Sequence, residues 1–255
     1  MNSQTDLQQI FQNGKKTLVL AHRGSLNINH YPENSIPAFE EAAQLGADGF
    51  ELDIRLSRDN VLMIFHDEKM TRLLGNSDRI SDLNYEEIRD HQFLNRPGNM
   101  DIRIPSLREL FEKFGSSVYY NIEVKRRFTN YKMVVQRLKE LIQKFDLENN
   151  VWISSFDPVF LYRWHRAFPI VRTAFLFENW NSFIRYICAR DFIQVLHPAV
   201  ELMPQLTTIC NFEKPLFFWT VDEEKELSLL REYDIRGVIT DNVTLCKRFI
   251  NHENE

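Results

Sequence analysis

Two acidic side chains, Glu51 and Asp53, alternate with apolar residues in the segment 49–56, GFELDIRL. In an extended strand, residues two apart point to the same face, so the two carboxylates are expected to be close neighbours. Ionising both is unfavourable unless a cation lies between them or one of them keeps its proton. The pattern therefore indicates a metal site or a shared proton. The alternative is an edge strand whose acidic face is simply solvated.

Two histidines follow short apolar runs. The apolar run at 61–65 is followed directly by His66. The apolar run at 18–21 is followed by His22 and Arg23, and Gly24 then interrupts the pattern. The pKa of an imidazole is near neutrality, so a histidine can give or take a proton at physiological pH. Beside a metal, His22 and His66 are therefore candidates for a general acid and a general base.

The composition is that of an ordinary globular protein. The chain has 255 residues, 44% of them hydrophobic and 20 of them Phe, which is enough for one large core. An α/β barrel of about 250 residues is a common single-domain solution at this length. The net charge is −5 with dispersed Lys and Arg, and no basic stripe indicates a nucleic-acid partner.

The amino-terminal segment and the hydropathy of the chain indicate where in the cell the protein is expected. Residues 1–16 are polar and lack the apolar region of a signal peptide, and no stretch of about 18 apolar residues occurs. We therefore expect a soluble, cytoplasmic protein without stable membrane insertion.

Strand-like and helix-like segments alternate along the chain. The expected strands are 18–21, the segment carrying Glu51 and Asp53, 117–124, 151–154, 172–177, 192–196, 216–221 and 237–240. The expected helices are 35–45, 105–114, 131–145, 158–167, 182–189, 200–209, 223–233 and 243–251. Eight such pairs, without a Gly-rich dinucleotide motif after the first strand, favour an α/β fold of the TIM (β/α)8 barrel type over an open sheet. We expect one domain over residues 1–255.

An insertion, at about 67–104, separates the second predicted strand from the third. It lacks clear periodicity, apart from a helical turn or two within 81–89 for which Ser81 is the expected N-cap. Long irregular connections often serve as lids or substrate walls, and a plain surface loop is the alternative.

In such barrels the chemistry lies at the carboxyl ends of the strands. Glu123 and Lys125 end the third predicted strand, on the same rim as Glu51 and Asp53. Three converging carboxylates suit Mg²⁺ or Ca²⁺, which take oxygen ligands, better than zinc. Lys125 and Arg23 can place positive charge beside phosphoryl oxygens. The sequence therefore predicts an anionic substrate that is bridged to a divalent metal.

Several short motifs occur in a characteristic order. They are AHRG at 21–24, PENS at 32–35, ELD at 51–53, HD at 66–67, NIEVK at 121–125, SSFDP at 154–158, WTVD at 219–222 and GVITD at 237–241. Each is weak alone, but together the set resembles the glycerophosphodiester phosphodiesterase family over nearly the whole chain. The resemblance implies a TIM barrel that hydrolyses glycerophosphodiesters to an alcohol and sn-glycerol 3-phosphate with a divalent metal.

The resemblance also implies roles at the matching positions. These are metal ligation by Glu51, Asp53 and Glu123, acid and base catalysis by His22 and His66, and substrate binding by Arg23, Lys125, Glu33 and Trp219. For Asn34, a helix cap or turn is an alternative to a supporting role. For Trp219, a place in the barrel core is the alternative to lining the glycerol side.

A two-step hydrolysis fits this resemblance. One histidine takes a proton from the glycerol 2-hydroxyl, which attacks phosphorus, and the other protonates the departing alcohol before water opens the cyclic phosphate. Either histidine can take either role.

Two other readings are open. A phospholipase D-like enzyme acting on lysophospholipids or sphingomyelin could use the aromatic-rich segments 156–168 and 175–186 to contact lipid, although helices packed on the barrel also explain them. A catalytically silent binding protein on the same barrel is the third reading, and it leaves the two histidines without a purpose.

Overall fold

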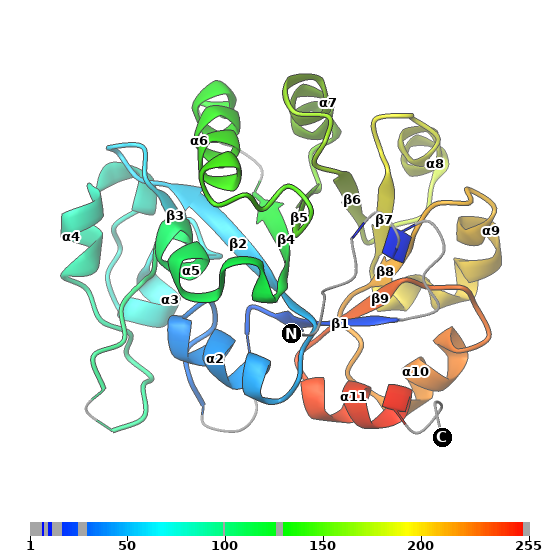
Figure 1. Cartoon of the computed structure of the whole chain (residues 1–255), viewed down its shortest axis with the longest axis horizontal. Coiled ribbons are helices and arrows are strands. Elements are labelled where there is room, and N and C mark those ends of the chain that lie inside the picture. Colours follow the sequence, from blue (N-terminus) through cyan, green and yellow to red (C-terminus); the bar gives the residue numbers. More distant parts are fainter. Residues whose placement is uncertain are drawn as a thin grey trace.

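The computed structural model describes residues 7, 10–11, 17–24, 30–98, 100–125 and 130–251. Eight parallel strands form a nearly closed barrel in the order β7-β6-β5-β4-β2-β1-β9-β8 (Figure 1). Their bounds are β1 Leu18–His22, β2 Gly49–Leu56, β4 Tyr119–Val124, β5 Val151–Ser155, β6 Thr173–Phe177, β7 Val195–Pro198, β8 Phe217–Phe218 and β9 Gly237–Thr240. Parallel bridges from Leu196 to Leu216 and from Ala199 to Trp219 join β7 to the β8 segment. The predicted TIM barrel is confirmed.

Helices surround the strands (Figure 1). They are α2 Ile36–Gln44, α5 Leu107–Phe114, α6 Tyr131–Lys144, α7 Pro158–Ala167, α8 Ser182–Cys188, α9 Leu206–Cys210, α10 Glu224–Leu230 and α11 Val243–Asn251, with short 3-10 turns η2 Gly115–Ser117 and η3 Val200–Gln205. Polar side chains begin several of them: Ser35 Oγ accepts the Ala38 N–H, and Asp157 Oδ1 accepts the Val159 N–H at 2.9 Å. The predicted helices after the insertion agree with these bounds to within a few residues, except at 200–209, where residues 200–205 form the 3-10 turn η3 and the α-helix begins only at Leu206.

The interior of the barrel changes from apolar to polar along β1 and β4. Inward-facing Leu18 and Leu20 precede His22 on β1, and Tyr119 precedes Asn121 and Glu123 on β4. The apolar members form one cluster with Leu7, Ile10, Phe11, Trp152, Ala174, Val195, Phe217 and Ile239. This cluster fills the amino-terminal half of the barrel, so the polar residues collect at the opposite mouth.

A larger cluster lies between the outward faces of the strands and the helices. Phe50 of β2 illustrates it, since its ring centroid lies 5.0 Å from that of Phe39 on α2. Burial on both sides explains why the strand sequences are rich in apolar residues and holds the rim in place.

The insertion has more structure than its sequence indicates. Just before it, β2 returns through a short antiparallel strand, β3 Leu62–Ile64, and within it lie α3 Thr71–Leu74, η1 Ile80–Asp82 and α4 Tyr85–Arg89. These elements share a hydrophobic cluster of Met63, Phe65, Met70, Leu74, Ile80, Ile88, Phe93, Ile102 and Ile104. Each piece is too short to establish a periodic pattern of its own.

The prediction of Ser81 as an N-cap is wrong. Ser81 lies inside the 3-10 turn η1, and Asn84 is the residue that precedes α4. The Glu87 carboxylate accepts the Asn84 backbone N–H at 2.7 Å, which is half of a capping box and favours a start at Asn84.

None of the helices in the described parts of the chain is both long and apolar enough to cross a membrane.

Candidate active site

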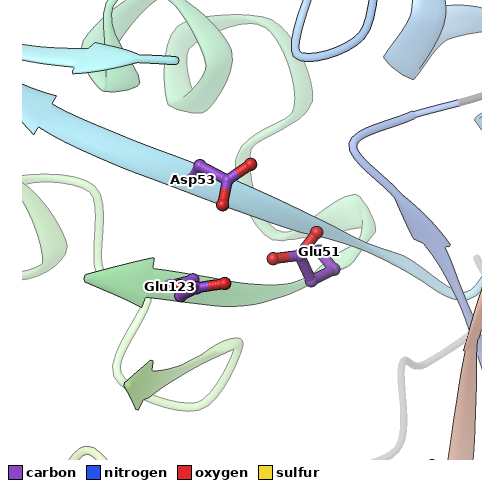
Figure 2. A group of neighbouring side chains, drawn as sticks. All are labelled: Glu51, Asp53 and Glu123. Carbon is purple, nitrogen blue, oxygen red and sulfur yellow. The ribbon is translucent and has the colours of Figure 1, made fainter. Parts of the chain in front are cut away.

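Three carboxylates meet at the mouth of the barrel (Figure 2). Glu51 and Asp53 lie on β2 and Glu123 lies on β4, and the register of the two strands places Asp53 beside Glu123. One oxygen from each of these buried residues lies within 4.8 Å of the others. The structure thus brings together the residues that the sequence predicts as metal ligands, because parallel strands carry them to one rim.

The charges of this cluster are tightly linked. Burial raises the pKa of Glu51 to about 8, and the neighbouring Asp53 charge adds to this. Burial also acts on Asp53, but the Lys125 and Arg23 cations outweigh it and hold the pKa of Asp53 well below its usual range. Burial raises the pKa of Glu123. Lys125 Nζ lies 2.6 Å from Asp53 Oδ1 and 2.7 Å from Glu123 Oε1, so an ammonium already offsets part of the negative charge.

The donor set fits a hard divalent cation. Glu51 Oε2 is buried and accepts no hydrogen bond from the described residues, and His22 Nε2 lies 3.9 Å from it. Asp53 Oδ2 accepts a hydrogen bond from Asn34 Nδ2 at 2.9 Å. A carboxylate has about four acceptor sites, so these bonds leave capacity for a cation. The set is made of oxygens only and suits Mg²⁺ and Ca²⁺ alike.

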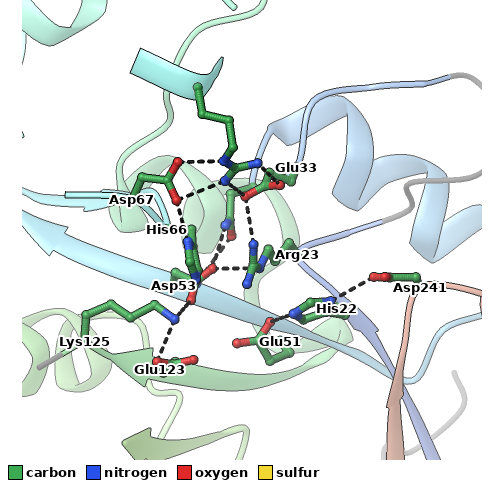
Figure 3. Close-up of polar contacts among 12 residues, drawn as sticks. His22, Arg23, Glu33, Glu51, Asp53, His66, Asp67, Glu123, Lys125 and Asp241 are labelled. Carbon is green, nitrogen blue, oxygen red and sulfur yellow. Dashed lines mark hydrogen bonds and ion pairs between the residues drawn. The ribbon is translucent and has the colours of Figure 1, made fainter. Parts of the chain in front are cut away.

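The ring of His22 is held by Asp241, which directly follows β9 (Figure 3). Its Nδ1 lies 2.8 Å from Asp241 Oδ1, and the Asp241 N–H donates to Asp222 Oδ1 at 2.8 Å. Burial lowers the pKa of His22, but the bond to Asp241 and the charge of Glu51 outweigh it, so the net shift is upward. Asp222 and Asp241 are the last residues of the motifs WTVD and GVITD, but nothing in the sequence pairs Asp241 with His22.

His66 lies just beyond β3 and is held at two points. Its Nδ1 lies 2.6 Å from Asp67 Oδ1, and its carbonyl oxygen accepts bonds of 3.0 and 2.7 Å from the Arg55 guanidinium. Burial lowers the pKa of His66, although the Asp53 charge opposes this.

Arg23 directly follows β1, and its backbone conformation is no longer that of a strand. Its φ of 55° is in the left-handed region, and its N–H still donates to the Glu51 carbonyl at 2.9 Å. Its guanidinium donates to Glu33 Oε1 at 3.0 Å and lies 3.2 Å from Asp53 Oδ2. Gly24, with φ +95°, has no alternative here, because a Cβ would lie 2.7 Å from the Ala38 Cβ.

The PENS segment supports these residues. The Glu33 carboxylate contacts Arg23 and Arg72, while the fully buried Asn34 donates to Asp53. The helix cap is Ser35 and not Asn34, so the alternative of Asn34 as a cap is wrong, but Asn34 does lie in a turn, with a φ of 58°. The sequence offered no signal for the part played by Arg72, which lies in the insertion.

Trp219 lies on the inner wall just past β8. It is partly buried, packs against the inner apolar cluster, and donates from Nε1 to the His197 carbonyl at 2.8 Å. Its ring meets that of Phe156 edge-on, with centroids 5.6 Å apart. The core contact is present, and contact with glycerol stays a prediction.

Known proteins resemble the chain over most of its length. The model of the glycerophosphoryl diester phosphodiesterase family matches residues 22–245. A glycerophosphodiester phosphodiesterase from Caldanaerobacter subterraneus is 33% identical, over 89% of this chain and 95% of that protein. A lysophospholipase D from Rattus norvegicus is 25% identical, over 91% of this chain and 86% of that protein.

A solved structure has the same fold. It is an Oleispira antarctica phosphodiesterase in complex with its product sn-glycerol-3-phosphate, with a TM-score of 0.82 and 19% identity over 97% of this chain and 100% of that one. The family match runs from His22, the last residue of β1, to Leu245 in the helix after β9. The chain therefore belongs to the glycerophosphoryl diester phosphodiesterase family of enzymes.

Proposed function

We propose that this enzyme hydrolyses glycerophosphodiesters to an alcohol and sn-glycerol 3-phosphate in a metal-dependent reaction. The observation that carries the proposal is the cluster of Glu51, Asp53 and Glu123, whose oxygens lie within 4.8 Å of one another beside two imidazoles. The product bound to the Oleispira antarctica phosphodiesterase supports the same reaction for this chain.

The proposed ligands of the divalent cation are Glu51, Asp53 and Glu123. When bound, the cation supplies charge that lowers the pKa of the glycerol 2-hydroxyl and offsets the charge developing on the phosphoryl group. Arg23 and Lys125 are cations on the same rim and can bind phosphate oxygens. Glu33 holds Arg23, and Trp219 can pack against the glycerol carbons.

His22 and His66 move the protons. One imidazole takes the proton of the 2-hydroxyl as that oxygen attacks phosphorus, and the other gives its proton to the departing alcohol oxygen. Water then opens the cyclic phosphate, and the imidazoles exchange roles. The carboxylates of Asp241 and Asp67 lie 2.8 and 2.6 Å from the two Nδ1 atoms, so Nε2 is the atom of each ring that would exchange protons with the substrate.

The test is a coupled assay for sn-glycerol 3-phosphate over a panel of glycerophosphodiesters with different head groups. We expect release that a chelator abolishes and that Mg²⁺ or Ca²⁺ restores. His22→Ala and His66→Ala should each lower kcat about 10²-fold or more. Activity that survives the chelator would remove the metal from the mechanism, and full turnover by both histidine variants would show that other residues move the protons.

Matched controls separate site effects from folding. Glu41→Gln alters a carboxylate in α2 that is also buried but outside the cluster, and His165→Ala removes a histidine of α7. We expect both to keep activity within about twofold of wild type, whereas Glu51→Gln should lose most of it.

Lysophospholipids are the second candidate substrate, since the Rattus norvegicus relative is named a lysophospholipase D. Two large side chains of α8, Phe183 and Tyr186, are 61% and 59% exposed and could contact an acyl chain. Choline release from lysophosphatidylcholine at a higher kcat/KM than glycerol 3-phosphate release from glycerophosphocholine would favour it. The higher identity to the Caldanaerobacter subterraneus enzyme supports the glycerophosphodiesters instead.

A further inference from the structure

One side chain of the insertion contacts two carboxylates of the site, Glu33 and Asp67, at once. Arg72, on α3, donates from Nη1 and Nη2 to the two oxygens of Glu33 at 2.8 and 2.7 Å. The same guanidinium donates from Nε and Nη2 to the two oxygens of Asp67 at 2.7 and 3.1 Å. Both pairs are bidentate, which is the most directional arrangement a guanidinium can form.

Each of these carboxylates in turn holds a residue that we place in the reaction. Asp67 Oδ1 lies 2.6 Å from His66 Nδ1. Glu33 Oε1 accepts from Arg23 at 3.0 Å, and Arg23 lies 3.2 Å from Asp53. Opposite charges therefore alternate from the insertion to the carboxylate cluster, and Arg72 is where the branch to His66 and the branch to Arg23 meet.

The two carboxylates depend on the cation between them. Burial would raise the pKa of Glu33 and of Asp67, but the hydrogen bonds from Arg72, together with Arg23 at Glu33 and His66 at Asp67, outweigh it, so both pKa values lie below the ordinary ones. Without the guanidinium, two like charges would face each other and separate. Lysine is a single point charge and cannot hold both carboxylates in two-point contact.

The backbone of α3 is fixed by the insertion. Met70 and Leu74, on either side of Arg72, are buried in the cluster of the insertion, and the Met70 N–H donates to the Asp78 carbonyl at 2.9 Å. Gly75 ends the helix with φ +73°. Arg72 is thus presented from a packed support, although its own side chain is 47% exposed.

We propose that Arg72 is a positioning residue for catalysis: by holding Asp67 and Glu33 it orients His66 and Arg23, and this is the contribution of the insertion to the reaction. The inference rests on the proposed function. It assigns Arg72 no contact with substrate or metal.

The first test compares Arg72→Gln with Arg79→Gln. Arg79 is a fair control because it lies in the same insertion, is 45% exposed, and pairs with a carboxylate, Glu68, outside this chain of contacts. We expect Arg72→Gln to lower kcat up to about 100-fold with a smaller change in KM, since misplaced catalytic groups cost mainly the chemical step. Arg72→Lys should recover part of the loss, and Arg79→Gln should stay within about twofold of wild type. Equal kcat values for the two glutamine variants would overturn the inference.

A double-mutant cycle asks whether Arg72 acts through Asp67. If it does, Arg72→Gln should lower kcat much less in an Asp67→Asn background than in wild type, because the second change removes a bond already lost. If Arg72→Gln lowers kcat by the same factor in wild type, in Asp67→Asn and in Glu33→Gln, the inference is contradicted. Thermal unfolding of each variant shows whether the loss is one of folding, and Arg72→Lys keeps the test valid if Arg72→Gln does not fold.

A spectroscopic test does not depend on turnover. In protein labelled with ¹⁵N-histidine, we expect His66 in wild type to carry its proton on Nδ1, facing Asp67, and to populate both tautomers in Arg72→Gln. An unchanged His66 tautomer in Arg72→Gln would overturn the inference. Wild-type protein that is inactive on every glycerophosphodiester would instead sink the proposed function, so the two failures are distinguishable.

Discussion

Asp241 Oδ1 lies 2.8 Å from His22 Nδ1, so the end of the last barrel strand holds the histidine that ends the first. These residues are 219 positions apart and meet because β9 pairs with β1 in parallel. The pairing of β9 with β1 therefore also orients His22, one of the proposed catalytic residues.

Removal of Asp241 should impair the chemical step. We expect Asp241→Ala to lower kcat about 10²-fold with little change in KM, because His22 loses the partner that orients its ring and favours its charged form. Steady-state kinetics on a glycerophosphodiester measure this. Asp234→Ala is the control, since Asp234 pairs with Arg236 and is exposed. A kcat for Asp241→Ala equal to that of the control would show that the bond is not needed.

Lys125 should matter for stability as well as for activity. Lys125→Met leaves Asp53 and Glu123 buried without their ammonium, and breaking a buried pair costs about 3–5 kcal/mol. Urea unfolding in chelator should show this loss, and an added divalent cation should restore part of it by replacing the missing charge. Lys113→Met, which breaks an exposed pair with Glu40, should change the free energy of unfolding by less than about 1 kcal/mol. A Lys125→Met protein as stable as this control would count against the linked charges described here.

At Asn121 we expect a substitution that raises the stability of the protein to lower its activity. It is fully buried on β4 beside Glu51 in the register, and neither polar atom of its side chain has a hydrogen-bond partner among the described residues. Unpaired buried polar groups are costly, so Asn121→Leu should raise the free energy of unfolding by about 1–3 kcal/mol. We expect kcat/KM to fall in the same variant. Lower stability of Asn121→Leu would mean that the amide is paired in solution.

His197 should make the protein sensitive to acid. Burial in the barrel lowers the pKa of His197 to about 3, compared with 6.5 for a histidine exposed to solvent. The unfolded chain therefore binds a proton that the folded chain refuses, and stability present above pH 6.5 is lost as the pH falls towards 3, by about 1.4 kcal/mol per pH unit at most.

The variant His197→Gln tests this, because it removes the titrating group and keeps an acceptor for Trp152 Nε1, which lies 3.4 Å from His197 Nε2. Urea unfolding between pH 7 and pH 4 should show a shallower loss for His197→Gln than for wild type. His30→Gln changes an exposed histidine and should keep the wild-type slope. Parallel slopes for all three proteins would refute the assignment to His197.

Much of the site was predictable because a parallel barrel brings strand ends together. Glu51 and Asp53 share a face by their two-residue spacing, and the rim rule places Glu123 beside them, as the register confirms. Local signals also sufficed for the helix that begins after Ser35. These features depend on one strand, one turn or the general rule of the fold.

The missing parts depend on specific contacts between distant segments. Arg72 reaches Glu33 across 39 positions, and nothing in the spacing of either residue indicates the other. The insertion itself was predicted, but its secondary structure was not, because its pieces, such as α3 at four residues, are too short to show a hydrophobic period. Ser81 failed as a cap because Asn84 has Glu87 three residues on to complete the motif.

The central claim is that Glu51, Asp53 and Glu123 hold one divalent cation. It is tested most directly by calorimetric titration of Mg²⁺ and of Ca²⁺ into chelator-treated wild type and into a Glu51→Gln, Asp53→Asn, Glu123→Gln triple variant whose folding is checked by circular dichroism. We expect one tight site per chain in wild type for at least one of the two ions and none in the triple variant. Equal binding by both proteins, or no binding by the wild type, would contradict it.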